Sequence, residues 1–190
     1  TKGQRLMESD LDLQFETPYA ISKYIGEKYV SFYHRFHTLP TVILRVFNSF
    51  GPGEWPGKYR NVIPNFFNRA INNESLVITG MGKETRNFTF VEDIVRGTFL
   101  AATSEKAVGE VINLGGKREV SILELANIVK KMTNNKKRVI FKPRRKWDNS
   151  FSRRGNLRLA EKLLKFKAEI PFETGLEKYY RWISKLIKSS

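Results

Sequence analysis

Residues 17–53 read TPYAISKYIGEKYVSFYHRFHTLPTVILRVFNSFGPG, and this stretch decides the class of fold. Proline suits the first turn of a helix, and apolar residues then recur at helical spacing as far as Phe36. Residues 42–47 are short, rich in β-branched side chains and bounded by proline and glycine, which is typical of a strand. A helix, a strand and a Gly/Pro loop in this order predict an α/β chain.

The rest of the chain continues the alternation. Apolar periodicity and turn residues predict extended segments at 76–79, 86–91, 110–114 and 139–142, and helices at 62–72, 92–102, 121–132, 157–164 and 174–187. Two of these helices are predicted to begin at capping boxes, Ser121–Glu124 and Thr174–Glu177. Residues 48–61 and 143–155 are predicted to be loops.

The positive charge is concentrated in one segment. The chain has 34 basic and 19 acidic side chains, a net charge of +15, and residues 130–167 hold 15 of the basic ones against Asp148 and Glu161. Such an excess fits a solvated surface, a phosphorylated ligand or a nucleic acid. The segment lacks the ladder of aromatic side chains on which bases stack, so nucleic acid is an unlikely partner.

Several classes of protein are excluded by composition. The absence of cysteine excludes disulfides, thiolate metal sites and a cysteine nucleophile, and it fits a reducing compartment such as the cytoplasm. No apolar run approaches the about 18–20 residues of a membrane-spanning helix, so no membrane partner is expected. His34 and His37 have no third ligand nearby, so no metal site is predicted. The chain begins without methionine or a signal peptide, and we expect it to be a piece of a longer protein.

Tyr19 and Lys23 stand four residues apart and therefore share one face of the first helix. A neighbouring ammonium favours the phenolate form of tyrosine, which makes the hydroxyl a usable base or acid near neutral pH. The pattern is common in helices rich in tyrosine and lysine, so it carries little weight alone.

The Tyr19–Lys23 pair belongs to a set of five separated motifs, which together are more specific than the pair alone. They are Thr17–Lys23, Leu44–Gly53, Arg60–Pro64, Gly80–Ile94 and Gly109–Gly115. In order and spacing, they resemble the extended short-chain dehydrogenase/reductase family, in its nucleotide-sugar epimerase/dehydratase branch. The resemblance covers residues 16–187.

The resemblance implies roles around the cofactor NAD. Tyr19 is implied to exchange a proton with a sugar hydroxyl during hydride transfer. Lys23 is implied to lower the pKa of Tyr19 and to hold the nicotinamide ribose. Val46 and Phe47 are implied to lie beside the nicotinamide.

It also implies a set of contacts to a nucleotide-diphosphate sugar. Asn48 and Arg86 are implied to reach the diphosphate, and Val62 to make a backbone contact to the nucleotide. Arg145 corresponds to a late arginine that clamps the phosphates, and Asp148 to a ribose contact. Arginine suits these positions because its planar fork pairs with two phosphate oxygens.

Other readings of these residues stay open. Arg45 is expected to be structural, Asn48 could shape the turn, and Arg86 could be a surface residue. Arg144 is the alternative to Arg145 in the neighbouring register. Asn87 stands where the family usually has aspartate.

The resemblance divides the chain into residues 1–53, the end of a Rossmann-type NAD domain, and residues 54–190, mainly a substrate domain with some segments returning to the first. The glycine-rich phosphate loop is absent and would precede residue 1. The expected function is an NAD-dependent 4-epimerase of a UDP- or dTDP-sugar that acts by transient oxidation, as a homodimer. A 4,6-dehydratase or decarboxylase of the same family is the alternative. A catalytically inactive module that binds nucleotides or nucleic acid is another.

Overall fold

The computed structural model describes residues 7, 17–57, 61–144, 152, 153 and 155–188. Its helices are Pro18–His37 (α1), Val62–Ile71 (α2), Val91–Thr103 (α3), Ile122–Thr133 (α4), Arg158–Leu164 (α5) and Phe172–Lys188 (α6), with a short 3-10 helix at Glu105–Ala107 (η1). Its strands are Ile43–Val46 (β1), Ser49–Phe50 (β2), Val77–Thr79 (β3), Thr85–Asn87 (β4), Thr89–Phe90 (β5), Val111–Leu114 (β6), Glu119–Ser121 (β7), Ile140–Lys142 (β8) and Ser152–Arg153 (β9). The predicted α/β class is confirmed.

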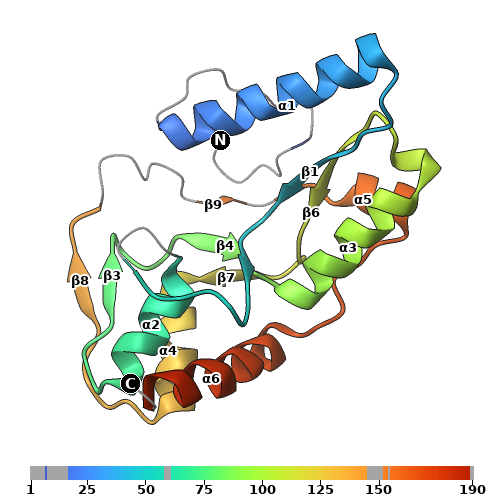
Figure 1. Ribbon diagram of the computed structural model, residues 1–190. Helices are drawn as coiled ribbons and strands as arrows, with labels where there is room; N and C mark the ends of the chain where they lie inside the picture. The colour runs from blue at the N-terminus through green and yellow to red at the C-terminus, as the bar shows by residue number, and fades with distance from the viewer. Residues whose placement is uncertain (1–6, 8–16, 58–60, 145–151, 154, 189–190) are drawn as a thin grey trace.

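A parallel pair of strands forms the upper part of the molecule in Figure 1. β1 pairs with β6 from Ile43 opposite Val111 to Val46 opposite Leu114. Helices α3 and α5 pack beside β6 around a buried apolar core. The core residues are Ile94, Ala101, Ala107, Ile112, Leu114, Ala160, Leu164 and Phe166. Parallel strands joined through helices are the expected product of an alternating α/β pattern.

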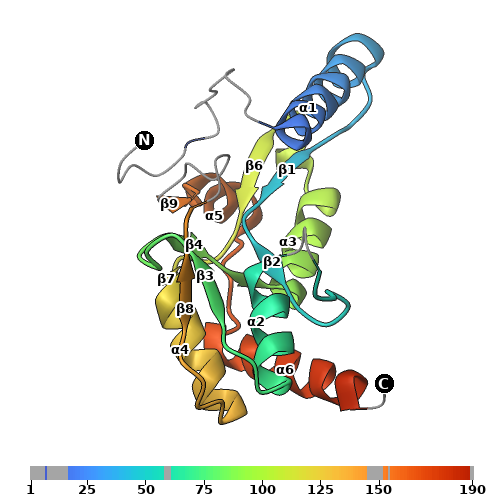
Figure 2. The same cartoon turned by 90° about the vertical axis from the view of Figure 1, so that its left-hand side faces the viewer.

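A second core lies below the first. Strands β3 and β8 pair in parallel there, β2 pairs in parallel with β5, and β4 lies between β7 and β9. Helices α2, α4 and α6 gather around this lower part, as Figure 2 shows. The largest of its fully buried side chains are Tyr179, Phe67, Phe90, Ile63, Leu76, Ile78, Leu125, Leu176 and Ile183.

Helix α1 lies apart from both cores and runs above the β1–β6 pair (Figure 1). Its bounds match the expected ones because Thr17 caps its first turn and Thr38 ends it in a left-handed conformation with φ of 54°. All twenty of its residues are described, and none is buried.

The start of α6 corrects one prediction. The helix begins at Phe172, not at a capping box Thr174–Glu177, so Thr174 and Gly175 lie inside it. A Cβ built on Gly175 would lie 2.9 Å from ring atoms of both Phe50 and Phe90. The glycine is there for close packing rather than for a helix end, and sequence pattern does not separate these two uses.

Three short strands also differ from the sequence-based prediction. β2 lies inside the predicted loop 48–61, β9 lies inside the predicted loop 143–155, and β7 precedes the capping box at Ser121. Each has two or three residues, too few for an alternating pattern to show. The box itself is confirmed, because the Ser121 hydroxyl accepts a hydrogen bond from the N–H of Glu124 at 3.0 Å.

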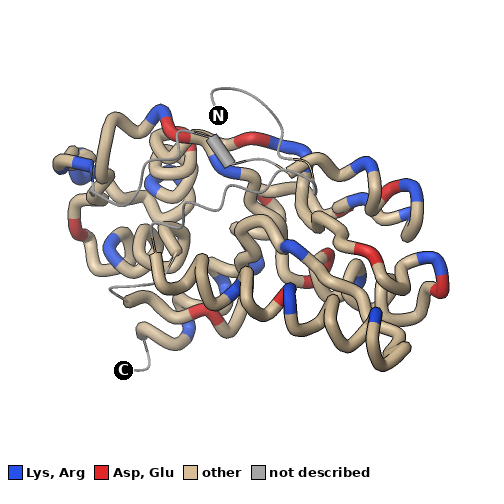
Figure 3. Tube along the Cα trace, turned by 90° about the horizontal axis from the view of Figure 1, so that it is seen from above, with Lys and Arg blue, Asp and Glu red and all other residues tan. Residues whose placement is uncertain are grey.

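Basic and acidic positions are interspersed along most of the trace, as Figure 3 shows. The described part of the basic segment runs from the last turn of α4 through the following loop and β8, and it continues in β9, in α5 and in residues 165–167. A search of the described helices found none long and apolar enough to cross a membrane.

Candidate active site

The predicted pair Tyr19 and Lys23 lies in the first two turns of α1. Thr17 accepts a hydrogen bond from the N–H of Ala20 at 3.2 Å and so fixes the start of the helix. Lys23 Nζ lies 5.5 Å from the centroid of the Tyr19 ring, and Tyr19 is 71% exposed. The exposed tyrosine hydroxyl is open to a reactant.

Arg45 is structural, as expected. Its Nε and Nη2 atoms donate to the two carboxylate oxygens of Glu27 at 2.8 and 2.7 Å. The bond joins the strand that leads to Phe47 with the helix that carries Tyr19.

Asn48 occupies a strained position directly after β1. Its φ is +39°, and its side-chain N–H donates to the carbonyl of Asn87 at 3.1 Å, while its own carbonyl accepts from the N–H of Thr89. These bonds support the turn-shaping reading, since they tie β1 to the segment between β4 and β5. Among the described residues its Oδ1 atom has no hydrogen bond, so the same side chain keeps an acceptor for a ligand.

The surroundings of Phe47 contain residues that sequence reasoning missed. The buried Thr89 hydroxyl donates to the carbonyl of Phe47 at 3.3 Å and accepts from the N–H of Gly116 at 2.7 Å. A Cβ on Gly155 would lie 2.6 Å from the Phe47 ring, and one on Gly115 would lie 3.2 Å from its Cβ. No sequence pattern identifies these residues, because segments far apart in the chain meet here.

Arg86 and Asn87 are neighbours in β4. Arg86 is half-buried and donates to the carbonyl of Thr85 at 2.8 Å. Asn87 is 3% exposed, and its side-chain N–H donates to the carbonyl of Arg118 at 2.9 Å. An ionised aspartate could not donate that bond, which explains how asparagine fits here. The Oδ1 atom of Asn87 has no partner among the described residues.

Val62 is the first residue of α2, where backbone N–H groups have no partner within the helix. The loop before it is held by Asn65, whose side chain accepts from the N–H of Gly57 and donates to the carbonyls of Gly57 and Asn61 at 3.0–3.1 Å. Asn65 was not singled out in the sequence.

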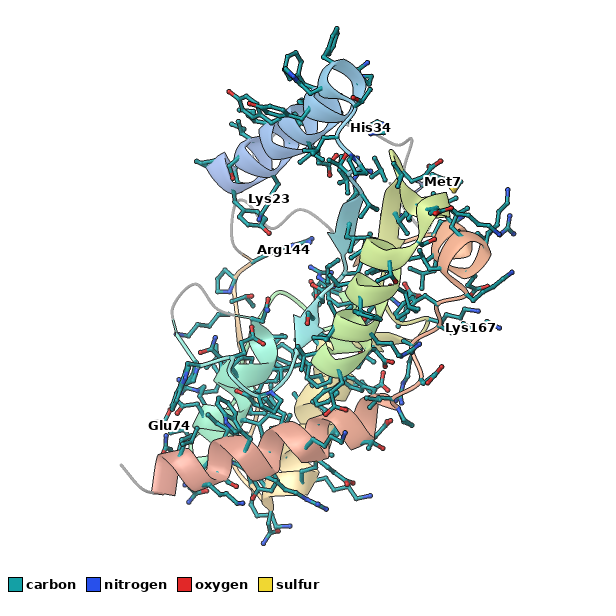
Figure 4. The ribbon with its side chains drawn as sticks, turned by 45° about the vertical axis from the view of Figure 1, so that its right-hand side comes forward. Met7, Lys23, His34, Glu74, Arg144 and Lys167 are labelled. Atoms are coloured by element: carbon teal, nitrogen blue, oxygen red, sulfur yellow. The ribbon has the colours of Figure 1, made fainter. Side chains whose placement is uncertain are left out.

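Arg145 and Asp148 lie outside the described residues. Arg144, the alternative for the phosphate-clamping position, follows β8 at the end of the described segment. Lys23 extends from α1 on the side where Arg144 lies (Figure 4). Within the described residues, no three His, Cys, Asp or Glu side chains are grouped to hold a metal ion.

Comparison with known proteins connects these residues to one family. The profile of the NAD dependent epimerase/dehydratase family matches residues 2–115. A UDP-N-acetyl-alpha-D-glucosaminuronate decarboxylase of Bacillus cytotoxicus is 33% identical over an alignment of 173 residues, and the match covers 88% of this chain and 53% of the relative. A putative UDP-glucose 4-epimerase of Methanocaldococcus jannaschii is 30% identical, with the same two coverages.

Solved structures with a similar fold point to the same family as the sequence matches. An epimerase of Methanothermobacter thermautotrophicus superimposes with a TM-score of 0.92 and 44% identity, over 95% of this chain and 55% of that one. A structure of the WbmF enzyme of Bordetella bronchiseptica contains NAD+ and UDP, and it matches with a TM-score of 0.83 and 34% identity over 95% and 57% of the two chains. The chain thus spans about half the length of the proteins it matches. On the match of sequence and fold together, this chain belongs to the NAD-dependent epimerase/dehydratase family.

Proposed function

We propose that this chain is the catalytic-tyrosine and substrate-binding part of an NAD-dependent nucleotide-sugar epimerase, with a UDP- or dTDP-sugar as substrate and C4 as the inverted carbon. The observation that carries the proposal is the Tyr19–Lys23 pair, exposed on α1 with the ammonium 5.5 Å from the ring centroid. Relatives described as UDP-sugar 4-epimerases support the choice of reaction.

The end of β1 fits the flat nicotinamide end of NAD. Val46 is 44% exposed there, and Phe47 packs closely against Gly115 and Gly155, where a Cβ would meet its side chain. Tyr19, Lys23, Val46 and Phe47 would hold that end. Bound NAD+ would supply the hydride acceptor for oxidation of the sugar carbon and the donor for its reduction.

Tyr19 moves the proton in this proposal. As phenolate, its oxygen takes the proton of the sugar C4 hydroxyl while the carbon is oxidised to a ketone, and it returns the proton when the opposite face is reduced. Lys23 is the partner of Tyr19 in this proposal, with its ammonium 5.5 Å from the ring centroid, and it would also hold the nicotinamide ribose.

The substrate contacts are part of the same proposal. Among the described residues, the Oδ1 atom of Asn48 has no hydrogen bond, Val62 stands at the first position of α2, and Arg86 contributes a half-buried side chain. Arg145 and Asp148 are proposed to close on the diphosphate and the ribose.

Domain division, assembly and location are also proposals. The two separate apolar cores support a cofactor part and a substrate part, with α3, β6 and α5 belonging to the first although they follow residue 53. The exposed apolar side chains of α1 support a homodimer; they include Ile21, Ile25, Phe32 and Phe36. The lack of cysteine supports a cytoplasmic location.

The test uses the full-length protein that contains this chain, with NAD+ and a panel of UDP- and dTDP-sugars followed by NMR. Inversion at C4 is the expected result. Loss of carbon dioxide from a UDP-uronic acid would replace the epimerase with a decarboxylase, the activity named for the Bacillus cytotoxicus relative. Loss of water from the sugar would indicate a dehydratase. NAD+ binding without turnover of any sugar would support the inactive module.

A further inference from the structure

A cavity of about 310 Å³ lies between the C-terminal half of α1 and the amino ends of β1 and β6. Its lining residues are Lys28, Ser31, His34, Arg35, Thr41, Ile43, Gly109 and Glu110. Phe47 and Asn48 follow the carboxyl end of β1, so the cavity lies at the opposite end of these strands. It is therefore separate from the proposed active site.

The helix side of the cavity is cationic. Lys28, Ser31 and Arg35 are spaced at i, i+3 and i+7 and so share one face of α1. The Nε atom of Arg35 donates to the carbonyl of Ser31 at 3.4 Å, and among the described residues the two terminal nitrogens of the guanidinium have no hydrogen bond. Within the described part of the chain, neither Lys28 nor Arg35 forms an ion pair. Lys28 Nζ lies 4.9 Å from the centroid of the Tyr24 ring. Cations without a carboxylate partner, together with hydroxyl groups around a concave site, attract an oxyanion.

The strand side adds an acceptor, Glu110, and a turn at Gly109 against which the ring of His34 on α1 lies. His34 Nδ1 lies 2.9 Å from the carbonyl of Leu39, and because a carbonyl only accepts, Nδ1 carries the hydrogen. Gly109 has a φ of +80°, and a Cβ there would lie 2.6 Å from His34 Nε2, so the turn must be glycine for the ring to sit there. Glu110 brings a carboxylate, which can only accept hydrogen bonds.

We propose that this cavity binds a phosphate group that still carries one proton. Arg35 and Lys28 would pair with its charged oxygens, and Glu110 would accept its remaining O–H. Inorganic phosphate keeps a proton on one of its oxygens at neutral pH, and a phosphate ester, with its second pKa at about 6, keeps one in the minor fraction that Glu110 would select. Sulfate has no proton to offer at that pH, and the Glu110 carboxylate would repel it. The site is therefore expected to select phosphate over sulfate.

Calorimetric titration of the full-length protein tests this proposal. NAD+ and UDP are kept saturating so that phosphate positions in the active site are filled, and the probes are inorganic phosphate, methyl phosphate and sulfate. Tighter binding of inorganic phosphate would identify the free ion as the ligand, and tighter binding of methyl phosphate would identify an ester. Arg35→Gln should weaken phosphate binding by about tenfold, the value of one lost charge-assisted hydrogen bond.

Two further variants make the test specific. Glu110→Gln should remove the preference for phosphate over sulfate, because an amide can donate to sulfate. Lys162→Gln, which removes an exposed cation on α5 away from the cavity, should leave binding unchanged. Absence of binding at millimolar phosphate, or equal affinity in the unaltered protein and Arg35→Gln, would overturn the proposal. Equal binding of sulfate by the unaltered protein would remove Glu110 from the site. Neither result depends on whether any sugar is turned over.

Discussion

Glu27 on α1 and Arg45 on β1 are joined by two hydrogen bonds of 2.7 and 2.8 Å, and each side chain is 23% exposed. The pair is the geometric link between the helix that carries Tyr19 and the strand that leads to Asn48. Within this chain α1 buries no residue, and the ion pair ties it to β1.

Breaking this pair should loosen α1. We expect Arg45→Met to cost about 1–3 kcal/mol of unfolding free energy, since the Glu27 carboxylate loses a charged partner in a half-buried position. Urea denaturation measures the loss, and the double variant with Glu27→Gln should recover part of it. Glu92→Gln is the control, because the Glu92–Lys178 pair is more exposed, at 56% and 44%. If both single variants cost the same, the pair does not anchor the helix.

Tyr19→Phe should lower kcat of the full-length enzyme by about 10²–10⁴, because it removes the group that moves the proton. Tyr29→Phe is a matched control on the same helix, where the side chain is 64% exposed. It should leave kcat unchanged, and NAD+ affinity should be similar in both variants. Near-normal turnover by Tyr19→Phe would remove this residue from catalysis.

The stability of the protein should depend on the hydroxyl group of Thr89, which lies beside Phe47. Thr89→Val leaves the carbonyl of Phe47 and the N–H of Gly116 without the hydroxyl between them, and should cost about 1–3 kcal/mol of stability. Thr89→Ser should restore most of this. Thr103→Val, which removes an exposed hydroxyl on α3, should have little effect in the same urea experiment. Equal losses at the two threonines would contradict the bridging role.

Two helix glycines should respond in opposite directions to alanine. Gly175→Ala places a Cβ 2.9 Å from the rings of Phe50 and Phe90 and should destabilise by about 1–3 kcal/mol through overpacking. Gly26→Ala meets nothing within 4 Å in α1 and should stabilise by about 0.5–1 kcal/mol. The melting temperatures of the two variants, compared with that of the unaltered protein, test both expectations. A stabilised Gly175→Ala protein would show that the core around Phe50 and Phe90 is packed more loosely than in the structure.

The loss of unfolding free energy at acidic pH should depend on Arg118. Its guanidinium donates to Glu173 at 2.6 and 2.7 Å and to Glu124 at 2.8 Å, and the hydrogen bond from Arg118 lowers the pKa of Glu173 below its ordinary 4.5. A lowered pKa stabilises the folded state above the ordinary value, and this contribution disappears as the pH falls through the lowered one.

Arg118→Gln should therefore lower stability at pH 7 and flatten its loss on acidification, by at most about 1 kcal/mol because these side chains are nearly half exposed. Unfolding free energies measured between pH 7 and 3 test this, with Arg181→Gln on α6 as the control. An unchanged slope in Arg118→Gln would show that Glu173 does not gain from the pair.

Local patterns predicted much of the fold for identifiable reasons. The bounds of α1 follow from Thr17 and Pro18, and the start of α4 follows from the capping box at Ser121, because both signals act within one turn of helix. The start of α6 was mispredicted because Gly175 is selected by contact with Phe50 and Phe90, which come from distant parts of the chain.

The sequence alone determined the α/β class, the Tyr19–Lys23 pair and the family to which the chain belongs, because spacing along one helix and the order of motifs are properties of the linear chain. Only the tertiary structure decided how Thr89, Gly116 and Gly155 surround Phe47, and that Arg45 anchors α1 through Glu27. The reason is physical: a buried hydrogen bond or a close packing contact joins residues tens of positions apart, and no local periodicity encodes which of them will meet.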